Sequence, residues 1–436
     1  MNKTFADLGV SEPLIKALAA REILAPFPIQ ERTLPDSLAG RDVLGRGKTG
    51  SGKTLAFALP LVARLAGGAR QKRPTGLVLA PTRELASQIA AVLAPLAAAH
   101  GLKITTIFGG VPQSRQENAL RTGVDIIVAC PGRLDDLMKQ RIVSLDTIAV
   151  TVIDEADHMA DLGFLPVVTR ILAATPSSGQ RLLFSATLDN GVDKLVKRFL
   201  RNPVTHAVDE VETPVPDMTH HVFHVDGAKS KKELVRQLAS GRSRRILFTR
   251  TKHQARKLAR ELTDSGVPSV DLHGNLSQPA RDRNLAAFTA GEARVLVATD
   301  IAARGVHVDG VELVVHVDPP AEHKAYLHRS GRTARAGNAG DVVTVVLPEQ
   351  RRETQTLMRR AGLNVKGQPV AADSPAVTVL VGEVAAYQAP APKPQTAPKP
   401  AQTAGSRRRR PANRQRNSNG GNGNARRGSH RTGARV

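Results

Sequence analysis

The sequence predicts an α/β protein with two tandem domains, each built on a mostly parallel sheet. Three observations support this fold class. The chain has 436 residues, of which 41% are apolar, and this is enough for more than one core. Short β-branched runs alternate with helical stretches along most of the chain, as in parallel sheets that are covered by helices. A proline-containing break at residues 202–219 separates two such series.

The first series runs from the N-terminus to residue 207. Each expected strand is a short apolar run that is followed by a turn or a helical segment. The expected strands are 42–44, 77–80, 104–108, 125–129, 149–153 and 181–184, and the clearest helices are 54–65 and 84–99. Pro203, Pro214 and Pro216 interrupt the pattern, so we assign residues 208–219 to a linker between the domains.

The second series covers residues 220–366 and repeats the same rhythm. Its expected strands are 220–225, 245–248, 269–272, 294–298, 313–317 and 342–347, and its helices are 231–239, 252–264 and 279–289. The pattern then fades into a Pro/Ala-rich stretch and an Arg/Asn/Gly-rich end. We therefore predict that residues 367–436 form a disordered basic tail.

The charge of the chain points to a polyanionic partner. The formal net charge is +23, and from residue 384 onward there are twelve Lys and Arg and no Asp or Glu. Such a balance favours nucleic acid. Because aromatic residues make up only 3% of the chain, we expect it to grip the phosphate backbone rather than stacked bases. The tail is the predicted sequence-blind anchor, with a merely solubilising tail as the alternative.

Several features bear on the compartment. A single cysteine, Cys130, excludes an intramolecular disulfide and cysteine-based zinc or iron–sulfur clusters, and it fits a reducing cytosol. No run of about 18 apolar residues is present, and residues 1–8 do not resemble a signal peptide. We expect a cytoplasmic protein without a membrane partner. The Ala-, Arg- and Val-rich composition without Trp favours a bacterial source.

A glycine-rich segment between the first expected strand and helix matches the phosphate-binding P-loop pattern. Its glycines let backbone N–H groups close around phosphates, its second lysine reaches the β- and γ-phosphates, and its threonine hydroxyl can bind Mg²⁺. The segment consists of Gly47, Lys48, Thr49, Gly50, Ser51, Gly52, Lys53 and Thr54. The sequence therefore predicts binding of a nucleoside triphosphate.

An acidic segment, Asp154-Glu155-Ala156-Asp157, directly follows the apolar run 149–153. A carboxylate at a strand end beside a P-loop is the acceptor that Mg²⁺ needs, and a second one can orient and deprotonate water. We assign Asp154 to the metal and Glu155 to the attacking water. Without the P-loop, the same residues would be read as an ordinary helix start.

Clusters of Gly, Pro, Thr and Arg follow one expected strand after another. Ligands of open α/β sheets bind beyond the carboxyl ends of the strands, so these clusters predict one extended binding surface over both domains. The clusters are Pro81-Thr82-Arg83-Glu84, Gly109-Gly110, Pro131-Gly132-Arg133, Ser185-Ala186-Thr187, Thr299-Asp300 and Asp318-Pro319-Pro320.

The basic segment 328–335 places Arg329, Arg332 and Arg335 three residues apart. This spacing turns them roughly one way on a turn or a helix start. The second series has no P-loop of its own, so these arginines could reach the triphosphate that the first domain holds, as arginine fingers do. The alternative is a solvated basic face.

As a set, these motifs resemble the DEAD-box ATP-dependent RNA helicases over residues 5–347, about four fifths of the chain. The resemblance implies two RecA-like domains, ATP and Mg²⁺ as cofactors, and RNA as the partner. It implies that Gln30 reads the adenine edge with Phe5 nearby, that Ser185 and Thr187 couple hydrolysis to unwinding, and that Arg332 and Arg335 are the fingers. His328 and Arg329 would make contacts between the domains, and Gly305 would belong to the nucleotide site. The implied RNA-binding residues are Pro81, Thr82, Arg83, Gly109, Gly110, Pro131, Gly132, Arg133, Gly274, Gln278, Arg281, Thr299 and Asp300.

The chain departs from the family pattern at a few positions. Gly47 and Cys130 replace the usual Ala and Thr, and Ala334 replaces a Gly, a change that we expect to be harmless. His307 stands where the family has an Asp that meets the ribose, which puts that contact in doubt.

Three functions share these residues: an RNA-unwinding ATPase, an ATP-gated RNA clamp or annealing factor, and a DNA helicase. Gln30 and the segment Asp154-Glu155-Ala156-Asp157, which matches the DEAD-box family, count against the DNA helicase. Ribosomal precursors and RNA-decay proteins are the partners that the resemblance implies.

Overall fold

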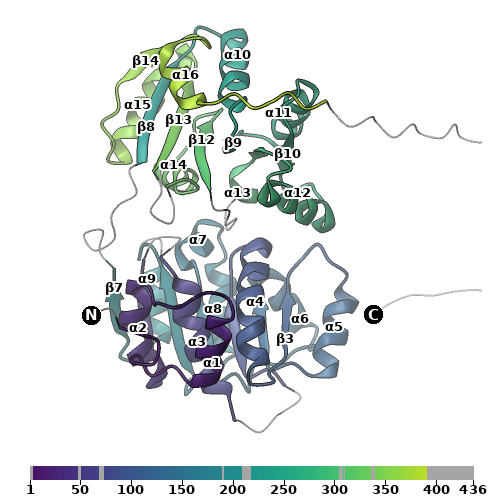
Figure 1. Cartoon of the computed structure of the whole chain (residues 1–436). Helices are drawn as coiled ribbons and strands as arrows, with labels where there is room; N and C mark the ends of the chain where they lie inside the picture. Colours follow the sequence, from purple (N-terminus) through teal and green to yellow (C-terminus); the bar gives the residue numbers. More distant parts are fainter. Residues whose placement is uncertain are drawn as a thin grey trace, which may run out of the picture. The chain divides into compact units, whose positions relative to one another are not determined.

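The computed structural model of this chain contains two seven-stranded sheets in which every pair of neighbouring strands is parallel. Figure 1 traces the elements along the chain. The structure describes residues 3–47, 51–67, 73–188, 191–208, 218–303, 308, 310–334 and 339–389. The predicted α/β class with two parallel sheets is confirmed.

The first sheet has the strand order β3-β4-β2-β5-β6-β1-β7. Its strands are β1 (Val43–Arg46), β2 (Gly76–Leu79), β3 (Ile104–Ile107), β4 (Ile126–Ala129), β5 (Val150–Ile153), β6 (Gln180–Ser185) and β7 (Val204–Ala207). Its helices are α1 (Glu12–Ala19), α2 (Pro28–Leu38), α3 (Lys53–Leu65), α4 (Arg83–Ala98), α5 (Gln113–Thr122), α6 (Pro131–Lys139), α7 (Ala156–Asp161), α8 (Leu165–Ala173) and α9 (Val192–Phe199).

The second sheet has the order β10-β11-β9-β12-β13-β8-β14, which is the order of the first sheet with each number raised by seven. Its strands are β8 (Met218–His224), β9 (Arg244–Phe248), β10 (Ser269–Leu272), β11 (Val295–Ala298), β12 (Val311–His316), β13 (Gly340–Val346) and β14 (Gly367–Pro369). Its helices are α10 (Ala228–Ala239), α11 (Lys252–Asp264), α12 (Gln278–Ala290), α13 (Asp300–Ala303), α14 (His323–Ser330), α15 (Arg351–Arg360) and α16 (Pro375–Val381). The two halves therefore repeat one topology.

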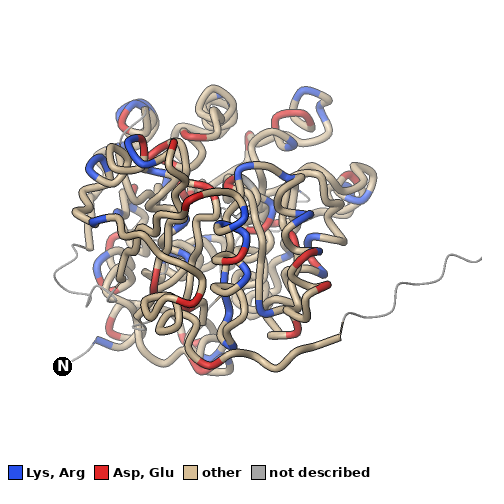
Figure 2. Tube along the Cα trace, turned by 90° about the horizontal axis from the view of Figure 1, so that it is seen from above, with Lys and Arg blue, Asp and Glu red and all other residues tan. Residues whose placement is uncertain are grey.

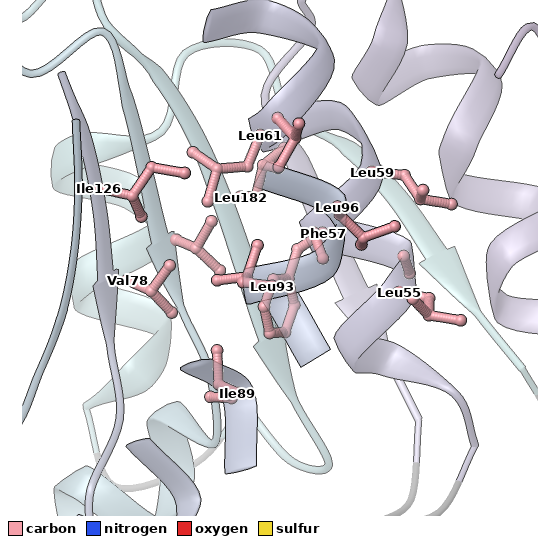
Figure 3. Packing of buried hydrophobic residues seen from close by; sticks show 14 of the residues in the cluster. Leu55, Phe57, Leu59, Leu61, Val78, Ile89, Leu93, Leu96, Ile126 and Leu182 are labelled. Atoms are coloured by element: carbon pink, nitrogen blue, oxygen red, sulfur yellow. The ribbon is translucent and has the colours of Figure 1, made fainter. Parts of the chain in front are cut away.

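The central strands are apolar without interruption because each sheet is buried on both faces. In β2, Val78 joins the hydrophobic cluster of α3 and α4, where Figure 3 shows it near Phe57 and Leu93. Its neighbours Leu77 and Leu79 join the cluster on the opposite face. The second sheet alternates in the same way along β11. This double burial positions the strand ends, and with them the loops that carry the predicted site.

Two edge strands were not expected from the sequence. β7 pairs with β1, and β14 pairs with β8, and each is short and only partly apolar. The polar, proline-containing composition of both segments favoured irregular structure. A parallel edge strand needs only backbone hydrogen bonds to one neighbour, and this hides it from a pattern search.

The tail boundary predicted at residue 367 is too early. Beyond it, β14 and α16 pack on the second sheet, and the segment 382–388 then crosses the domain as an extended strap. The Ala385 amide donates to Ser240 O at 2.9 Å, and the Gln388 amide donates to Gly266 O at 3.1 Å. The buried guanidinium of Arg245 donates through Nη2 to Val381 O at 2.7 Å. The fold therefore extends to residue 388 at least, through the carbonyl partner of Arg245 and the backbone bonds of the strap.

Some predictions cannot be examined in this structure. The linker residues 209–217 and the basic tail from residue 390 onward lie outside the described residues. Within the described ranges, no helix combines the length and the apolarity that a membrane crossing requires.

Candidate active site

The P-loop begins at the end of β1 and closes onto the first turn of α3. Gly52 has a left-handed backbone with φ of 89°, and a Cβ there would lie 2.7 Å from Gln30 Nε2. Only glycine adopts this conformation at no steric cost, so the tight turn depends on it. A Cβ at Gly47 would lie 2.8 Å from Ser51 Oγ, which suits the glycine found there. Lys48, Thr49 and Gly50 lie outside the described residues.

Lys53 brings a buried positive charge to this loop. Its Nζ donates to Gly47 O at 2.9 Å, and the side chain is buried. Its charge favours the ionised forms of both Asp154 and Glu155, which lie 101 and 102 residues later in the sequence. The structure therefore places the P-loop lysine near the acidic segment.

Gln30 ties the start of α2 to the same loop. Its Nε2 donates to Gly52 O at 2.8 Å, and its Oε1 accepts from the Phe27 amide at 3.0 Å. One amide hydrogen and one lone pair remain for a base edge, so the role in reading adenine stays a prediction. The assignment of Phe5 to the nucleotide site needs correction, because its ring is buried in the core with Leu8 and Leu14. The burial of the Phe5 ring among apolar side chains explains why a phenylalanine is found at this position.

The acidic segment follows β5, and both of its first carboxylates are buried. Glu155 has φ of 49° and ψ of 54°, a left-handed backbone that costs a non-glycine residue about 1–2 kcal/mol. Such strain concentrates at functional positions. Burial raises the pKa of Asp154, and the charge of Glu155 adds to this, while Lys53 opposes it. Burial alone would also raise the pKa of Glu155, but His158, Lys53 and Arg332 outweigh it and lower that pKa.

Asp157 connects the acidic segment to the loop after β6, the strand that lies between β5 and β1. Its Oδ2 accepts from the Ala186 amide at 3.2 Å and from the Thr187 amide at 3.0 Å. Ser185 Oγ accepts from the Asp157 amide at 3.1 Å and donates to Thr187 O at 2.7 Å. The Gly47 amide also donates to Ser185 O at 3.3 Å. The two predicted coupling residues thus touch both catalytic loops.

The described part of the basic segment, residues 328–334, lies at the end of α14 and in the turn after it, not at a helix start. Arg332 is buried, its Nε donates to His328 O at 3.2 Å, and its charge acts on Glu155. The structure therefore brings Arg332 toward the acidic segment of the first sheet. Ala334 has φ of 54°, so the exchange of a usual glycine for alanine is not harmless but strained. Gly305, His307 and Arg335 lie outside the described residues.

Arg329 corrects the expectation of a contact between the domains. Its guanidinium forms an ion pair with Asp300, with Nη2 2.8 Å from Oδ2, and Nη1 donates to Asp318 O at 2.8 Å. It also lies over the Phe248 ring, 5.2 Å from the centroid. All three partners belong to the second sheet or its loops. Arg329 therefore links three parts of the second half. Its ion pair uses the carboxylate of Asp300, which the sequence analysis predicted to contact RNA.

Two predicted RNA contacts of the second half meet the first half. Arg281 is buried, and its Nε donates to Glu84 Oε1 at 2.7 Å, with side-chain exposures of 8% and 5%. Arg83 Nη1 lies 3.4 Å from Gln278 Oε1. The side chain of Arg83 also packs on Gly110, where a Cβ would lie 1.9 Å from its Nη1. These residues connect the two halves through an ion pair and a hydrogen bond. Their direct contact with RNA stays a prediction.

The remaining predicted RNA contacts lie at strand ends as expected. Thr82 caps α4, because its Oγ1 accepts from the Leu85 amide at 3.3 Å. Pro131, Gly132 and Arg133 form the first turn of α6 rather than a loop. No atom lies within 4 Å of a Cβ built at Gly132 or Gly274, so both backbones are open to a ligand. The same ends carry Gly109 and Thr299.

The sequence analysis missed the partner of Glu84 and the role of His158. Glu84 belongs to a predicted binding cluster, but nothing local indicates a partner 197 residues away. His158 follows the acidic segment, and its Nδ1 lies 3.0 Å from Glu155 Oε2. A titratable residue in the first turn of α7 was the one available signal.

Basic and acidic positions are mixed over the described part of the chain, as Figure 2 shows. Residues 384–436, with twelve Lys and Arg and no Asp or Glu, carry +12 of the net charge of +23, and the first 383 residues carry the other +11.

The residues present fit Mg²⁺. The Thr54 hydroxyl and the Asp154 carboxylate are the hard oxygen ligands that this ion prefers. Among the described residues, no group of three or more His, Cys, Asp or Glu could hold a metal by itself. Mg²⁺ suits such a site because substrate phosphates and water complete its coordination.

Comparison with known families identifies both halves. Residues 27–195 match the family model described as DEAD/DEAH box helicase, and residues 229–337 match the helicase conserved C-terminal domain.

Two curated relatives illustrate the sequence similarity. The chain is 38% identical over 366 residues to DEAD-box ATP-dependent RNA helicase 9, mitochondrial, of Arabidopsis thaliana, covering 82% of this chain and 59% of the relative. It is 36% identical over 367 residues to ATP-dependent RNA helicase drs1 of Neosartorya fischeri, covering 82% and 44%. The chain thus spans about half the length of the curated relatives it matches.

Two solved structures share the fold. S. cerevisiae Dbp5 bound to RNA and ADP BeF3 is 28% identical with a TM-score of 0.76, covering 87% of this chain and 100% of that one. Mss116p bound to ssRNA and AMP-PNP is 25% identical with a TM-score of 0.75, covering 87% and 82%.

Proposed function

We propose, from the premise that the chain belongs to the DEAD-box ATP-dependent RNA helicase family, that it hydrolyses ATP when RNA binds and locally unwinds RNA duplexes or remodels RNA–protein complexes. One observation carries the proposal. The buried carboxylates Asp154 and Glu155 both lie in the field of Lys53 from the P-loop, and Glu155 also lies in the field of Arg332 from the second half.

The first half supplies most of the chemistry. Backbone N–H groups of the P-loop and the Lys53 ammonium bind the phosphates. Thr54 and Asp154 would hold Mg²⁺, which neutralises charge on the phosphates when it is bound. Glu155 orients the attacking water and accepts its proton. Arg332, with Arg335, stabilises the charge that develops on the transferred phosphoryl group, a contribution of roughly 10³–10⁵ in rate where arginine fingers have been measured.

RNA binding and hydrolysis are coupled because both halves contribute to each site. ATP on the first half and RNA across both halves favour the arrangement in which Arg332 reaches the phosphates. A bent single strand fits such a surface better than a straight duplex, so a few base pairs separate. Loss of the γ-phosphate then weakens the arrangement and releases RNA.

An ATPase assay with matched RNA and DNA oligonucleotides tests the proposal. We expect RNA, and not DNA, to stimulate turnover. We expect Glu155→Gln to bind ATP and RNA but to lose nearly all turnover, leaving a residual rate that only single-turnover experiments detect. Equal stimulation by DNA would indicate a DNA helicase, and full activity of Glu155→Gln would remove Glu155 from its role.

Separation of a short labelled duplex distinguishes unwinding from clamping. ATP-dependent release of one strand supports the helicase. ATP-dependent RNA binding without strand release would favour the clamp or annealing factor, which uses the same residues.

The partner class and the compartment complete the proposal. RNA as the ligand is supported by the bound RNA in the Dbp5 and Mss116p structures. Ribosomal precursors and RNA-decay proteins stay predictions of the family resemblance. A bacterial source and a cytoplasmic location stay predictions from composition, and the two curated relatives named above come from a plant and a fungus.

A further inference from the structure

His158 is a buried histidine that the proposed mechanism does not use. It lies in the first turn of α7, with a side chain that is 5% exposed. Its Nδ1 is 3.0 Å from Oε2 of Glu155, three residues earlier. Its own amide donates to Asp157 Oδ1 at 3.0 Å, which fixes the backbone from which the ring extends.

The chemistry of the pair fixes the direction of this hydrogen bond. A glutamate side chain is ordinarily ionised at neutral pH, and a carboxylate only accepts hydrogen bonds. Nδ1 of His158 must therefore carry the hydrogen and donate it. Oε2 is occupied by this bond, and Oε1 is left to receive a proton.

We propose that His158 is a positioning residue that holds Oε2 of Glu155 and so presents Oε1 to the attacking water. The inference rests on the proposed function. In the step that it supports, the water oxygen bonds to the γ-phosphorus, and the bond from that phosphorus to the bridging oxygen breaks. ADP leaves with the electron pair, and the water proton passes to Oε1.

A fixed carboxylate matters here because its surroundings pull it in other directions. Glu155 has a strained left-handed backbone, and the charges of Lys53 and Arg332 act on it as well. Without a donor at Oε2, the carboxylate could turn toward either cation and lose its alignment. Misplacement of a reacting group by about 1 Å can cost roughly 10²-fold in rate.

His158 also faces the second half of the chain. Its ring centroid lies 6.3 Å from that of His328, in the segment that carries Arg332. Its Nε2 is buried and has no hydrogen-bond partner within the described residues. The histidine that orients Glu155 therefore lies close to the segment that contains Arg332.

Two substitutions separate donation from packing. His158→Leu fills the site without a donor, and His158→Asn places an amide N–H close to the former position of Nδ1. We expect His158→Leu to lower the RNA-stimulated kcat about 10- to 100-fold, as loss of an orienting partner does elsewhere. The KM for ATP should change less than about threefold, and His158→Asn should keep most of the kcat.

His206 offers a matched control, because its Nε2 lies 2.7 Å from Asp36 Oδ2 in another part of the first half. His206→Leu removes a similar histidine–carboxylate pair and should leave kcat unchanged. A Glu155→Gln background gives the readout that a structural role would not produce. There, His158→Leu should cause no further loss of single-turnover rate, because the group that it positions is already gone.

The outcomes are distinct. Unchanged kcat in His158→Leu, equal loss in His158→Asn, or a further loss in the Glu155→Gln background would each overturn the inference. If His158→Leu fails to bind ATP, the comparison of His158→Asn with wild type at saturating ATP decides. Failure of RNA to stimulate the wild-type chain would instead reject the proposed function.

Discussion

The ion pair between Glu84 and Arg281 makes a quantitative prediction about the coupling of the two halves. The two side chains are 5% and 8% exposed and lie 2.7 Å apart. Removing one partner of such a buried pair leaves an uncompensated charge and costs about 3–5 kcal/mol. If RNA binding favours the arrangement of the halves in which this pair forms, Glu84→Met or Arg281→Met should weaken RNA binding with an ATP analogue roughly 150- to 5,000-fold.

The double variant is the sharper test. Glu84→Met with Arg281→Met leaves no buried charge, and apolar replacement of a whole buried pair is often neutral. We expect RNA titrations monitored by fluorescence anisotropy to show recovery of most of the affinity. Arg242→Met is the control, because its partner Glu383 lies 2.9 Å away but both side chains are exposed. Additive losses in the double variant, or a loss of equal size in the control, would refute the reasoning.

Four further predictions concern single features. Gly52→Ala places a Cβ 2.7 Å from Gln30 Nε2, on a backbone with φ of 89°. The ATP affinity measured by calorimetry should therefore fall roughly 5- to 30-fold. Gly227→Ala is the control, because its Cβ would meet no atom within 4 Å and the ATP affinity should not change. Ala334→Gly relieves a left-handed alanine and should raise the free energy of unfolding by about 0.5–1 kcal/mol in urea titrations; a decrease would argue against that strain. Burial lowers the pKa of His316 well below its ordinary value, so this neutral side chain contributes its full stability above about pH 6.5 and loses it as the pH falls. His316→Phe should therefore flatten the pH dependence of the free energy of unfolding between about pH 6.5 and 5.5. An identical slope in the variant would contradict this. Deletion of residues 390–436 removes twelve Lys and Arg and should flatten the salt dependence of RNA binding by about 0.7 for each lost phosphate contact, whereas an unchanged slope would indicate a solubilising tail.

Strongly patterned elements were predictable from the sequence. The run that forms β5 is buried on both faces, and its acidic successor marks the catalytic edge. The glycines of the P-loop predicted a tight turn, and Gly52 has the left-handed backbone that such a turn requires. The edge strands β7 and β14 were missed because each satisfies one neighbour through backbone bonds, with little apolar patterning. The strap after α16 was missed because backbone hydrogen bonds, which leave no apolar pattern in the sequence, hold much of it.

The partners of charged residues were the least predictable part of the site. Arg281 finds Glu84 across 197 residues, and Arg329 finds Asp300 in its own half. Arginine spacing limits where a guanidinium can point, but only the tertiary fold decides which carboxylate it meets. The pairing of His158 with Glu155 was within reach, since the two residues are only three apart in the sequence.

The central claim is that ATP and RNA each favour the arrangement in which Arg332 reaches the triphosphate. The direct measurement is the affinity of the full chain for a non-hydrolysable ATP analogue, titrated with and without saturating single-stranded RNA. Because such coupling is reciprocal, RNA should tighten the analogue by about 5- to 150-fold, and the analogue should tighten RNA by the same factor. Equal affinities in the two titrations, together with RNA-independent turnover, would contradict the account.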